Sequence, residues 1–300
     1  MYSKPVTTIA QQIRQLKERG LLISDDEAAA HYLSNISYYR RVGYWWPMQA
    51  DKITHIFKPN SKFDDVIALY NFDRELRILL FDVIERIEIS LRTKMSYHLS
   101  HEHGFWWFQK TELFLDTRQL IVTLASLEEE LQRSKDIFIK DHKKKHSDDL
   151  RFPPSIKTLE IATFGNLSRM YGNLKPGVAA KDAIASELKT VNHTYLHSWL
   201  QSIAQIRNTC AHHSRLWNKS LAIKPSLLPK PPAPWIENVP PANEHNKLYI
   251  HVCCMKYLLD AVSPGHHLKE KLAALFEKYP SVDLAALGFD QKWRQEPLWT

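Results

Sequence analysis

Glycine and cysteine are scarce in this chain of 300 residues, which has only 8 of the former and 3 of the latter. So few glycines argue against a turn-rich β fold and favour helices. The cysteines include the adjacent pair Cys253 and Cys254, and an odd number with this spacing does not make a disulfide framework. The chain also lacks any run of the roughly 18 apolar residues that a membrane span needs, and residues 1–19 have no apolar leader segment. We therefore expect a soluble, cytoplasmic protein that works under reducing conditions.

Positive charge is in excess, with 40 Lys and Arg against 33 Asp and Glu, which gives a net charge of +7. A basic balance favours a polyanionic partner, RNA or DNA before a membrane. The 9 Trp and 12 Tyr are many, and such residues serve either a large core or an aromatic surface that stacks on a ligand. Charge and aromatic content together direct attention to nucleic acid without locating a site.

Apolar residues recur at helical spacing along most of the chain. Ser24 and Glu27 form a capping-box pattern at the start of one such segment, and Gly20 is a stop signal for the segment before it. Residues 64–101 contain neither Pro nor Gly, which predicts one long helix or two nearly collinear ones. The predicted helices cover residues 8–19, 24–35, 64–101, 117–142, 156–171, 178–188, 195–217, 248–261 and 268–278, with a short one near 284.

A proline-rich stretch suggests how the chain is divided. Seven prolines fall between residues 225 and 241, which predicts an extended connector in which Trp235 and Ile236 dock on the rest of the protein. The expected parts are an N-terminal helical and aromatic segment (1–60), a main helical domain (61–220), the connector (221–245) and a C-terminal helical segment (246–300).

Two segments are candidates for RNA contact. Residues 38–47 hold five aromatics and two arginines before a proline, which suits either a loop that covers the core or a platform on which RNA bases stack. The basic run near residue 143 suits either a solvated helix end or a contact with the phosphate backbone. The candidate RNA-binding residues are Arg40, Arg41, Tyr44, Lys143, Lys144 and Lys145.

The segment RNTCAHHSRLWN, residues 207–218, is the most informative. Arg207 continues the apolar stripe of its helix, where a charge is costly unless it is paired or faces a cleft or an interface. Asn208 and His212 are four residues apart and therefore share a face, so that Asn208 can orient the imidazole. Arg207 and His212 are about 140° apart around an ideal helix. Either the helix distorts or a second copy of the chain completes the site across a two-fold axis.

This set of residues suits cleavage of RNA by transesterification. A histidine can deprotonate the 2′-hydroxyl or protonate the leaving 5′-oxygen, and an arginine stabilises the negative charge that builds on the phosphorus centre. RNA carries its own nucleophile, so neither a metal ion nor a cofactor is required. On spacing alone, a structural network of ion pairs and helix caps is the better explanation of the same residues.

Two other chemistries fit poorly. A metal site would need ligands from His212, His213, His251, Cys253 and Cys254, and none of these has a recognised ligand spacing. A thiol protease built on Cys210 and His212 would place its nucleophile and its base on different sides of the helix.

The segment 207–218 resembles the abortive-infection (Abi-like) protein family of the HEPN superfamily, whose signature is Arg followed after four to six residues by His. Further stretches match in order over roughly residues 10–220. They are LKERGL (16–21), YYRRVGYW (38–45), LYNFDRELR (69–77), IERIEISLR (84–92), FGNLS (164–168) and SWL (198–200).

The resemblance implies an all-α, HEPN-like helical bundle with additional N- and C-terminal helices and a homodimer with a composite site. It implies a metal-independent endoribonuclease of phage defence with Arg207, Asn208 and His212 as catalytic residues, or, alternatively, a non-catalytic RNA-binding HEPN module. It also implies a partner that restrains a toxin, such as a structured RNA. Two questions stay open: whether His213 is a second acid–base group or a core residue, and whether Glu88 and Arg92 orient the site or form a buried ion pair.

Overall fold

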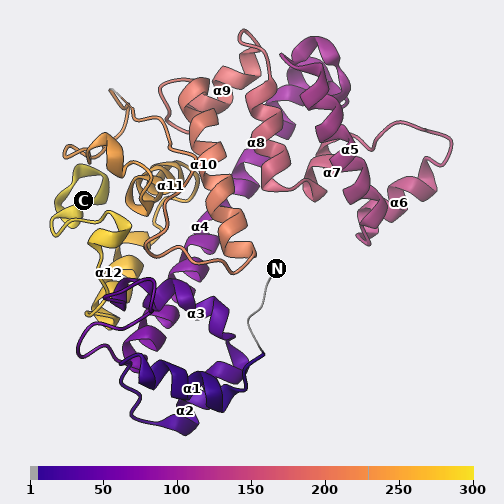
Figure 1. The fold of residues 1–300 in the computed structure, drawn as a ribbon. Helices are drawn as coiled ribbons and strands as arrows, with labels where there is room; N and C mark the ends of the chain where they lie inside the picture. Colours follow the sequence, from indigo (N-terminus) through magenta and orange to yellow (C-terminus); the bar gives the residue numbers. More distant parts are fainter. Residues whose placement is uncertain (1–5, 229) are drawn as a thin grey trace.

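The computed structural model describes residues 6–228 and 230–300, and these form helices without any β-strand (Figure 1). The predicted all-α fold is confirmed. The α-helices are α1 (Ile9–Glu18), α2 (Asp26–Asn35), α3 (Tyr38–Trp45), α4 (Phe63–His103), α5 (Thr117–Arg133), α6 (Ile137–Lys145), α7 (Ser155–Thr158), α8 (Phe164–Asn173), α9 (Ala179–Glu187), α10 (His193–Ala211), α11 (Leu248–Val262) and α12 (Leu268–Lys278). None of the helices in the described part combines the length and apolar character needed to cross a bilayer.

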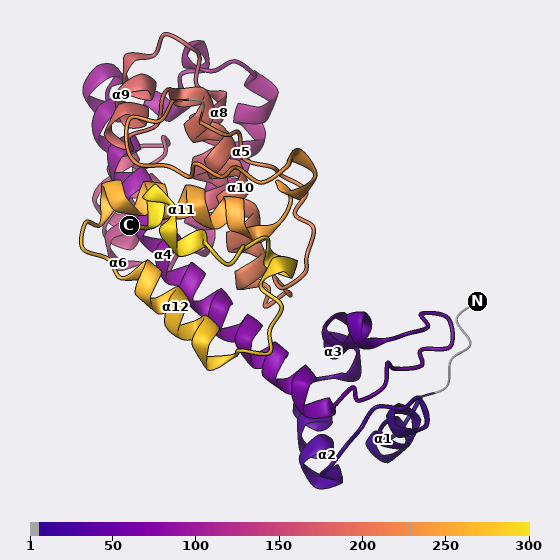
Figure 2. The same cartoon turned by 90° about the vertical axis from the view of Figure 1, so that its left-hand side faces the viewer.

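Helix α4 is the axis around which the other helices pack. Its 41 residues correspond to about 60 Å of length, and neither Gly nor Pro interrupts it. The expected long helix is therefore a single element. Helices α9, α10, α11 and α12 all contact it. Figure 2 shows α1, α2 and α3 at one end of α4, with α5, α8 and α9 near the other.

The first two helices form close to where the sequence predicts them. Thr8 caps α1 in a capping box with Gln11, and Gly20, with φ of 89°, follows the end of that helix. The predicted cap of α2 is wrong by one residue. The side chain of Asp25, not Ser24, accepts the backbone N–H of Ala28 at 2.9 Å. An aspartate serves as well as a serine at this position.

Residues 38–45 form helix α3, so the loop expected there is wrong. Ser37 begins the helix by accepting the backbone N–H of Arg40 at 3.4 Å. Because neighbouring positions on a helix are about 100° apart, Arg40 and Arg41 point in different directions. Arg40 is exposed, whereas Arg41 is buried.

Two helices predicted as continuous are each broken. The segment 117–142 divides into α5 and α6 because Ser134 and Asp136 bond each other, through Ser134 Oγ to the carboxylate at 2.9 Å and the Asp136 backbone N–H to Ser134 Oγ at 3.2 Å. The segment 156–171 divides into α7, a short 3-10 helix and α8, which begins where Thr163 accepts the N–H of Asn166 at 3.2 Å. No Gly or Pro lies between α5 and α6, and Gly165 falls inside α8, after the second break.

Helix α10 ends at Ala211 rather than at the predicted residue 217. His213 adopts a left-handed backbone with φ of 54°, which ends the helix and turns the chain. Asn218 turns it again, with φ of 50°. Residues 212–218 therefore form a loop at the end of α10.

The proline-rich connector is docked on the helices, as expected. Trp235 is buried and stacks on Trp199 of α10, with ring centroids 5.3 Å apart. Trp199 Nε1 donates to the carbonyl of Ser226 at 2.6 Å. One continuous core of buried apolar side chains includes residues before and after the connector. The C-terminal helices α11 and α12 complete this core against α4.

Candidate active site

Arg207 lies on the last turns of α10, at the edge of the side that faces the core. Trp199, Leu200, Ile203 and Ile206 of the same helix are fully buried, as their spacing predicts. Arg207 itself is partly buried, and its Nε forms no hydrogen bond within the described part of the chain. The guanidinium therefore keeps donor capacity that the surrounding protein does not use.

Glu88 of α4 lies within electrostatic range of Arg207 and forms an ion pair with Arg92 on the same helix. Arg92 Nη2 is 2.9 Å from Glu88 Oε1, and the Arg92 guanidinium also donates to the carbonyls of Leu159 at 2.7 Å and Ala162 at 3.1 Å. Burial raises the pKa of Glu88 above its ordinary value, and the positive charges of Arg92 and Arg207 oppose this shift. The ion pair expected as one alternative is therefore present, and its carboxylate also interacts with Arg207.

Asn208 and His212 line an open pocket of about 530 Å³. The pocket lies between α8, α10 and the loop 212–218 with the residues that follow it. Both side chains are exposed, and the backbone N–H of His212 donates to the carbonyl of Asn208 at 3.0 Å. Arg169 and Lys219 also line the pocket, while Asp and Glu are absent from its lining. The pocket is therefore suited to an anionic ligand.

Within one chain, Arg207 and His212 are not brought together. Arg207 does not line the pocket that contains His212, and its positive charge acts on Glu88 of α4 instead. This separation agrees with the angle of about 140° between the two positions on a straight helix. The helix does not distort to join them, because it ends at Ala211 with His212 as its C-cap.

The loop after His212 is attached to α3. His213 is exposed, so it is not a core histidine, and its carbonyl accepts a hydrogen bond from Arg40 Nη1 at 2.6 Å. Arg215 Nη1 donates to the carbonyl of Gly43. A Cβ at position 43 would lie 3.0 Å from Arg215 Nε, so this glycine lets the guanidinium lie against the helix.

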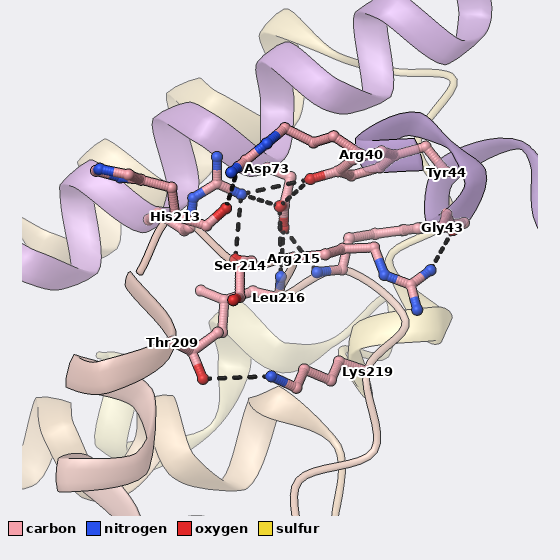
Figure 3. Close-up of polar contacts among 12 residues, drawn as sticks. Arg40, Gly43, Tyr44, Asp73, Thr209, His213, Ser214, Arg215, Leu216 and Lys219 are labelled. Atoms are coloured by element: carbon pink, nitrogen blue, oxygen red, sulfur yellow. Dashed lines mark hydrogen bonds and ion pairs between the residues drawn. The ribbon is translucent and has the colours of Figure 1, made fainter. Parts of the chain in front are cut away.

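The same loop is attached to α4 through a buried carboxylate, as Figure 3 shows. Asp73, fully buried, accepts the hydroxyl of Tyr44 at 2.7 Å and the backbone N–H groups of Leu216 at 3.0 Å and Trp217 at 2.7 Å. It also forms an ion pair with Arg77, one helical turn away. These bonds satisfy the carboxylate and fix the backbone that follows His212.

The sequence stretches 38–45, 69–77 and 207–218 therefore meet in one cluster, made of Tyr44, Asp73, Arg77 and the loop. Asp73 and Arg77 were missed as candidate residues. The available signal was an Asp and an Arg four residues apart on one helix, which also describes ordinary surface ion pairs. Burial distinguishes this pair from surface ion pairs, and burial depends on tertiary packing that the local sequence does not reveal.

Several predicted RNA-binding residues are not at the surface. Arg41 is fully buried, 5.5 Å from the ring centroid of Phe63, and burial lowers its pKa to about 10. Tyr44 is 1% exposed and bonded to Asp73. In this fold neither Arg41 nor Tyr44 offers a surface on which RNA can stack. Arg40 is exposed, although its guanidinium bonds the loop.

The lysine run lies elsewhere. Lys143, Lys144 and Lys145 are exposed at the end of α6. Figures 1 and 2 show α6 away from α3. Lys143 Nζ also donates to the carbonyl of Leu131 at 2.9 Å. The structure therefore does not unite the lysines with Arg40 in one surface.

The cysteines are buried. Burial raises the pKa of Cys210 to about 12, which keeps this thiol protonated and unsuited to act as a nucleophile at neutral pH. Cys253 and Cys254 are fully buried, and His251 lies between two backbone carbonyl oxygens, each 2.9 Å from a ring nitrogen. Among the residues that the structure describes, no three His, Cys, Asp or Glu side chains are grouped as metal ligands.

These features define an all-helical protein with an open, acid-free polar pocket at the end of a core helix. The model of the family described as Abi-like protein matches residues 31–218, more than half of the chain, and the chain belongs to this family. The matched range contains the Asp73 cluster as well as Arg207, Asn208 and His212. No curated protein and no solved structure matches the chain.

Proposed function

We propose that the protein is a metal-independent endoribonuclease that acts in bacterial abortive-infection defence against phage. The observation that carries the proposal is the exposed imidazole of His212 in a pocket with cationic and amide side chains and no carboxylate. Membership of the Abi-like family supports the defence role. Placement in the HEPN superfamily, and restraint of the activity by a partner such as a structured RNA, belong to the same proposal.

The chemistry follows from what RNA itself supplies. The 2′-oxygen attacks the adjacent phosphorus as its proton passes to a base, the bond from phosphorus to the 5′-oxygen breaks, and the 5′-oxygen takes up a proton. The products are a 2′,3′-cyclic phosphate and a 5′-hydroxyl end. His212 acts as one of the proton-transfer groups, with Asn208 beside it in the pocket. Arg207 supplies fixed positive charge to the pentacoordinate phosphorane.

The active form in this proposal is a homodimer. Arg207 and His212 lie on different sides of α10, so one chain does not present both to a single phosphate. Two copies related by a two-fold axis place Arg207 of one subunit opposite His212 of the other, and each dimer then contains two composite sites.

Cleavage of a mixed-sequence RNA in the presence of EDTA tests the activity. The wild type is expected to give cyclic-phosphate ends, and Arg207→Ala and His212→Ala are expected to give none. His267→Ala, which removes an exposed imidazole just before α12 with 76% of its side chain accessible, is the control and is expected to cut normally. Cutting by either site variant at the wild-type rate would show the assignment to be wrong. Binding without cleavage by the wild type would indicate the RNA-binding module instead.

Mixing the two inactive variants tests the composite site. In a random mixture, half of the dimers contain one chain of each kind, and such a dimer has one intact site out of two. About a quarter of the wild-type activity is therefore expected to return. A mixture that stays inactive, although the chains exchange, would place Arg207 and His212 of the same chain in one site.

A further inference from the structure

Two cations in the His212 pocket have no role in the reaction described above. Arg169 projects from α8 and Lys219 follows the loop 212–218, and both line the pocket together with Asn208 and His212. Residue 169 is exposed and residue 219 is partly exposed, so solvent reaches both side chains.

Neither cation is neutralised by a carboxylate in the described part of the chain. Arg169 Nη2 donates to the amide oxygen of Asn166, and Lys219 Nζ donates to the hydroxyl of Thr209 at 3.4 Å. Some exposed cations of this protein are paired instead, for example Lys278 with Glu75 at 2.8 Å. Two unpaired positive charges in an acid-free pocket give it a local positive potential.

The fold holds Arg169 in place. Asn166, which is fully buried, donates through Nδ2 to Ser126 Oγ at 3.2 Å, and this bond directs its amide oxygen toward Arg169. Asn166 belongs to the stretch FGNLS that the sequence singled out. It is therefore a positioning residue for the guanidinium, and this gives the stretch a physical meaning.

The backbone also directs Lys219 toward the pocket. The left-handed turn at Asn218 folds the chain back along α10, and Figure 3 shows the Lys219 side chain extended toward Thr209 of that helix. Asparagine is among the side chains that adopt this conformation most readily. The lysine consequently lies on the same side of α10 as His212.

We propose that Arg169 and Lys219 bind the phosphates of single-stranded RNA next to the scissile one. This inference rests on the proposed function, because it takes RNA as the substrate. Arginine matches phosphate oxygens with paired N–H donors, and lysine acts as a mobile point charge. Contacts of this kind hold the strand in register without reading its sequence. The pocket therefore takes the sugar–phosphate backbone with little preference among bases.

Binding of a 2′-O-methyl RNA oligonucleotide, which lacks the attacking hydroxyl, separates this inference from catalysis. Fluorescence anisotropy over a range of salt concentrations gives the slope of log affinity against log salt. Arg169→Ala and Lys219→Ala are each expected to reduce that slope by about 0.7, the value for one phosphate contact with a single strand. Lys219→Arg is expected to keep it. Lys292→Ala, which removes an exposed lysine outside the pocket, is the charge-matched control and is expected to leave it unchanged.

The outcomes distinguish the two proposals. If the wild type cuts RNA but the Arg169 and Lys219 variants keep the wild-type affinity and slope, the phosphate assignment is wrong and the nuclease stands. If the slope falls as expected but no RNA is cut, the nuclease proposal is wrong and the binding site stands. A wild type without affinity for the oligonucleotide overturns the binding site. Circular dichroism confirms that each variant is folded before it is scored.

Discussion

Replacing Asp73 with asparagine is the most direct test of the cluster that fixes the loop beyond His212. The carboxylate accepts bonds from the Tyr44 hydroxyl, the Arg77 guanidinium and the backbone N–H groups of Leu216 and Trp217. An asparagine of the same size has one acceptor oxygen instead of two and turns an NH₂ group toward donors. It also removes the charge that balances Arg77.

The expected cost follows from burial. The side chains of Asp73 and Arg77 are 0% and 6% exposed, so Asp73→Asn leaves a buried guanidinium without its counter-charge. Breaking a buried pair on one side costs about 3–5 kcal/mol. Tyr44→Phe removes one hydrogen bond to a charged acceptor and should cost less, about 1.5–3 kcal/mol. Because whole domains are stable by only about 5–15 kcal/mol, the first loss is large.

Urea unfolding followed by tryptophan fluorescence measures both losses. Helix α4 supplies a matched control in Asp82, which forms the same kind of pair with Arg86 four residues on, at 3.4 Å, with both side chains about 40% exposed. Asp82→Asn is expected to cost less than about 0.5 kcal/mol. Equal destabilisation by Asp73→Asn and Asp82→Asn would refute the argument from burial. Asp73→Leu combined with Arg77→Met removes the unpaired charge but leaves the Tyr44 hydroxyl and the N–H groups of Leu216 and Trp217 without their acceptor. The double variant should therefore recover only the part of the loss that comes from the unpaired guanidinium.

Two further predictions concern the crossing of α8 and α10. A Cβ at Gly172 would lie 2.0 Å from His197 Nε2, so Gly172→Ala should lower the free energy of unfolding by about 1–3 kcal/mol. In the double variant, His197→Ala should relieve that cost. Losses that simply add in the double variant would contradict the contact. Burial, with the charges of Lys181 and His193, lowers the pKa of His197, so the unfolded chain takes up a proton before the folded one does. Stability should therefore fall as the pH drops below about 6.5. His197→Gln should make this fall shallower in urea unfolding between about pH 7 and 5, and His251, whose pKa burial also lowers, should account for part of the remainder. An unchanged slope would count against the shift.

Regular patterns made most of the helices predictable, while the breaks came from local chemistry that has no strong signal. The long run without Gly or Pro correctly predicts α4. The break between α5 and α6 depends on hydrogen bonds between Ser134 and Asp136, two residues that also occur within continuous helices. The end of α10 follows from the left-handed backbone of His213, which has no strong signal in the sequence. Asp73, distant in sequence, then fixes the loop by accepting the backbone N–H groups of Leu216 and Trp217.

The candidate site was predictable where helical geometry alone decides it. Asn208 and His212, four residues apart, do line one pocket, and Arg207 lies elsewhere, as its angle around the helix predicts. The prediction that Arg41 contacts RNA was wrong because residues 38–47 were expected to form a loop, and a loop has no regular spacing that tells buried from exposed positions. In the helix that forms there, Arg41 points into the core and is buried, whereas Arg40 is exposed.

The ties between α3 and the loop 212–218 have a practical consequence for anyone who shortens this protein. Arg40 and Gly43 bond the loop, and Tyr44 bonds the carboxylate that holds it. A chain trimmed to start near residue 60 would lose all three anchors while keeping every residue of the pocket. If such a fragment were inactive, the cause would be that the His212 imidazole is no longer held in position. The result would not contradict the chemistry proposed for the intact molecule.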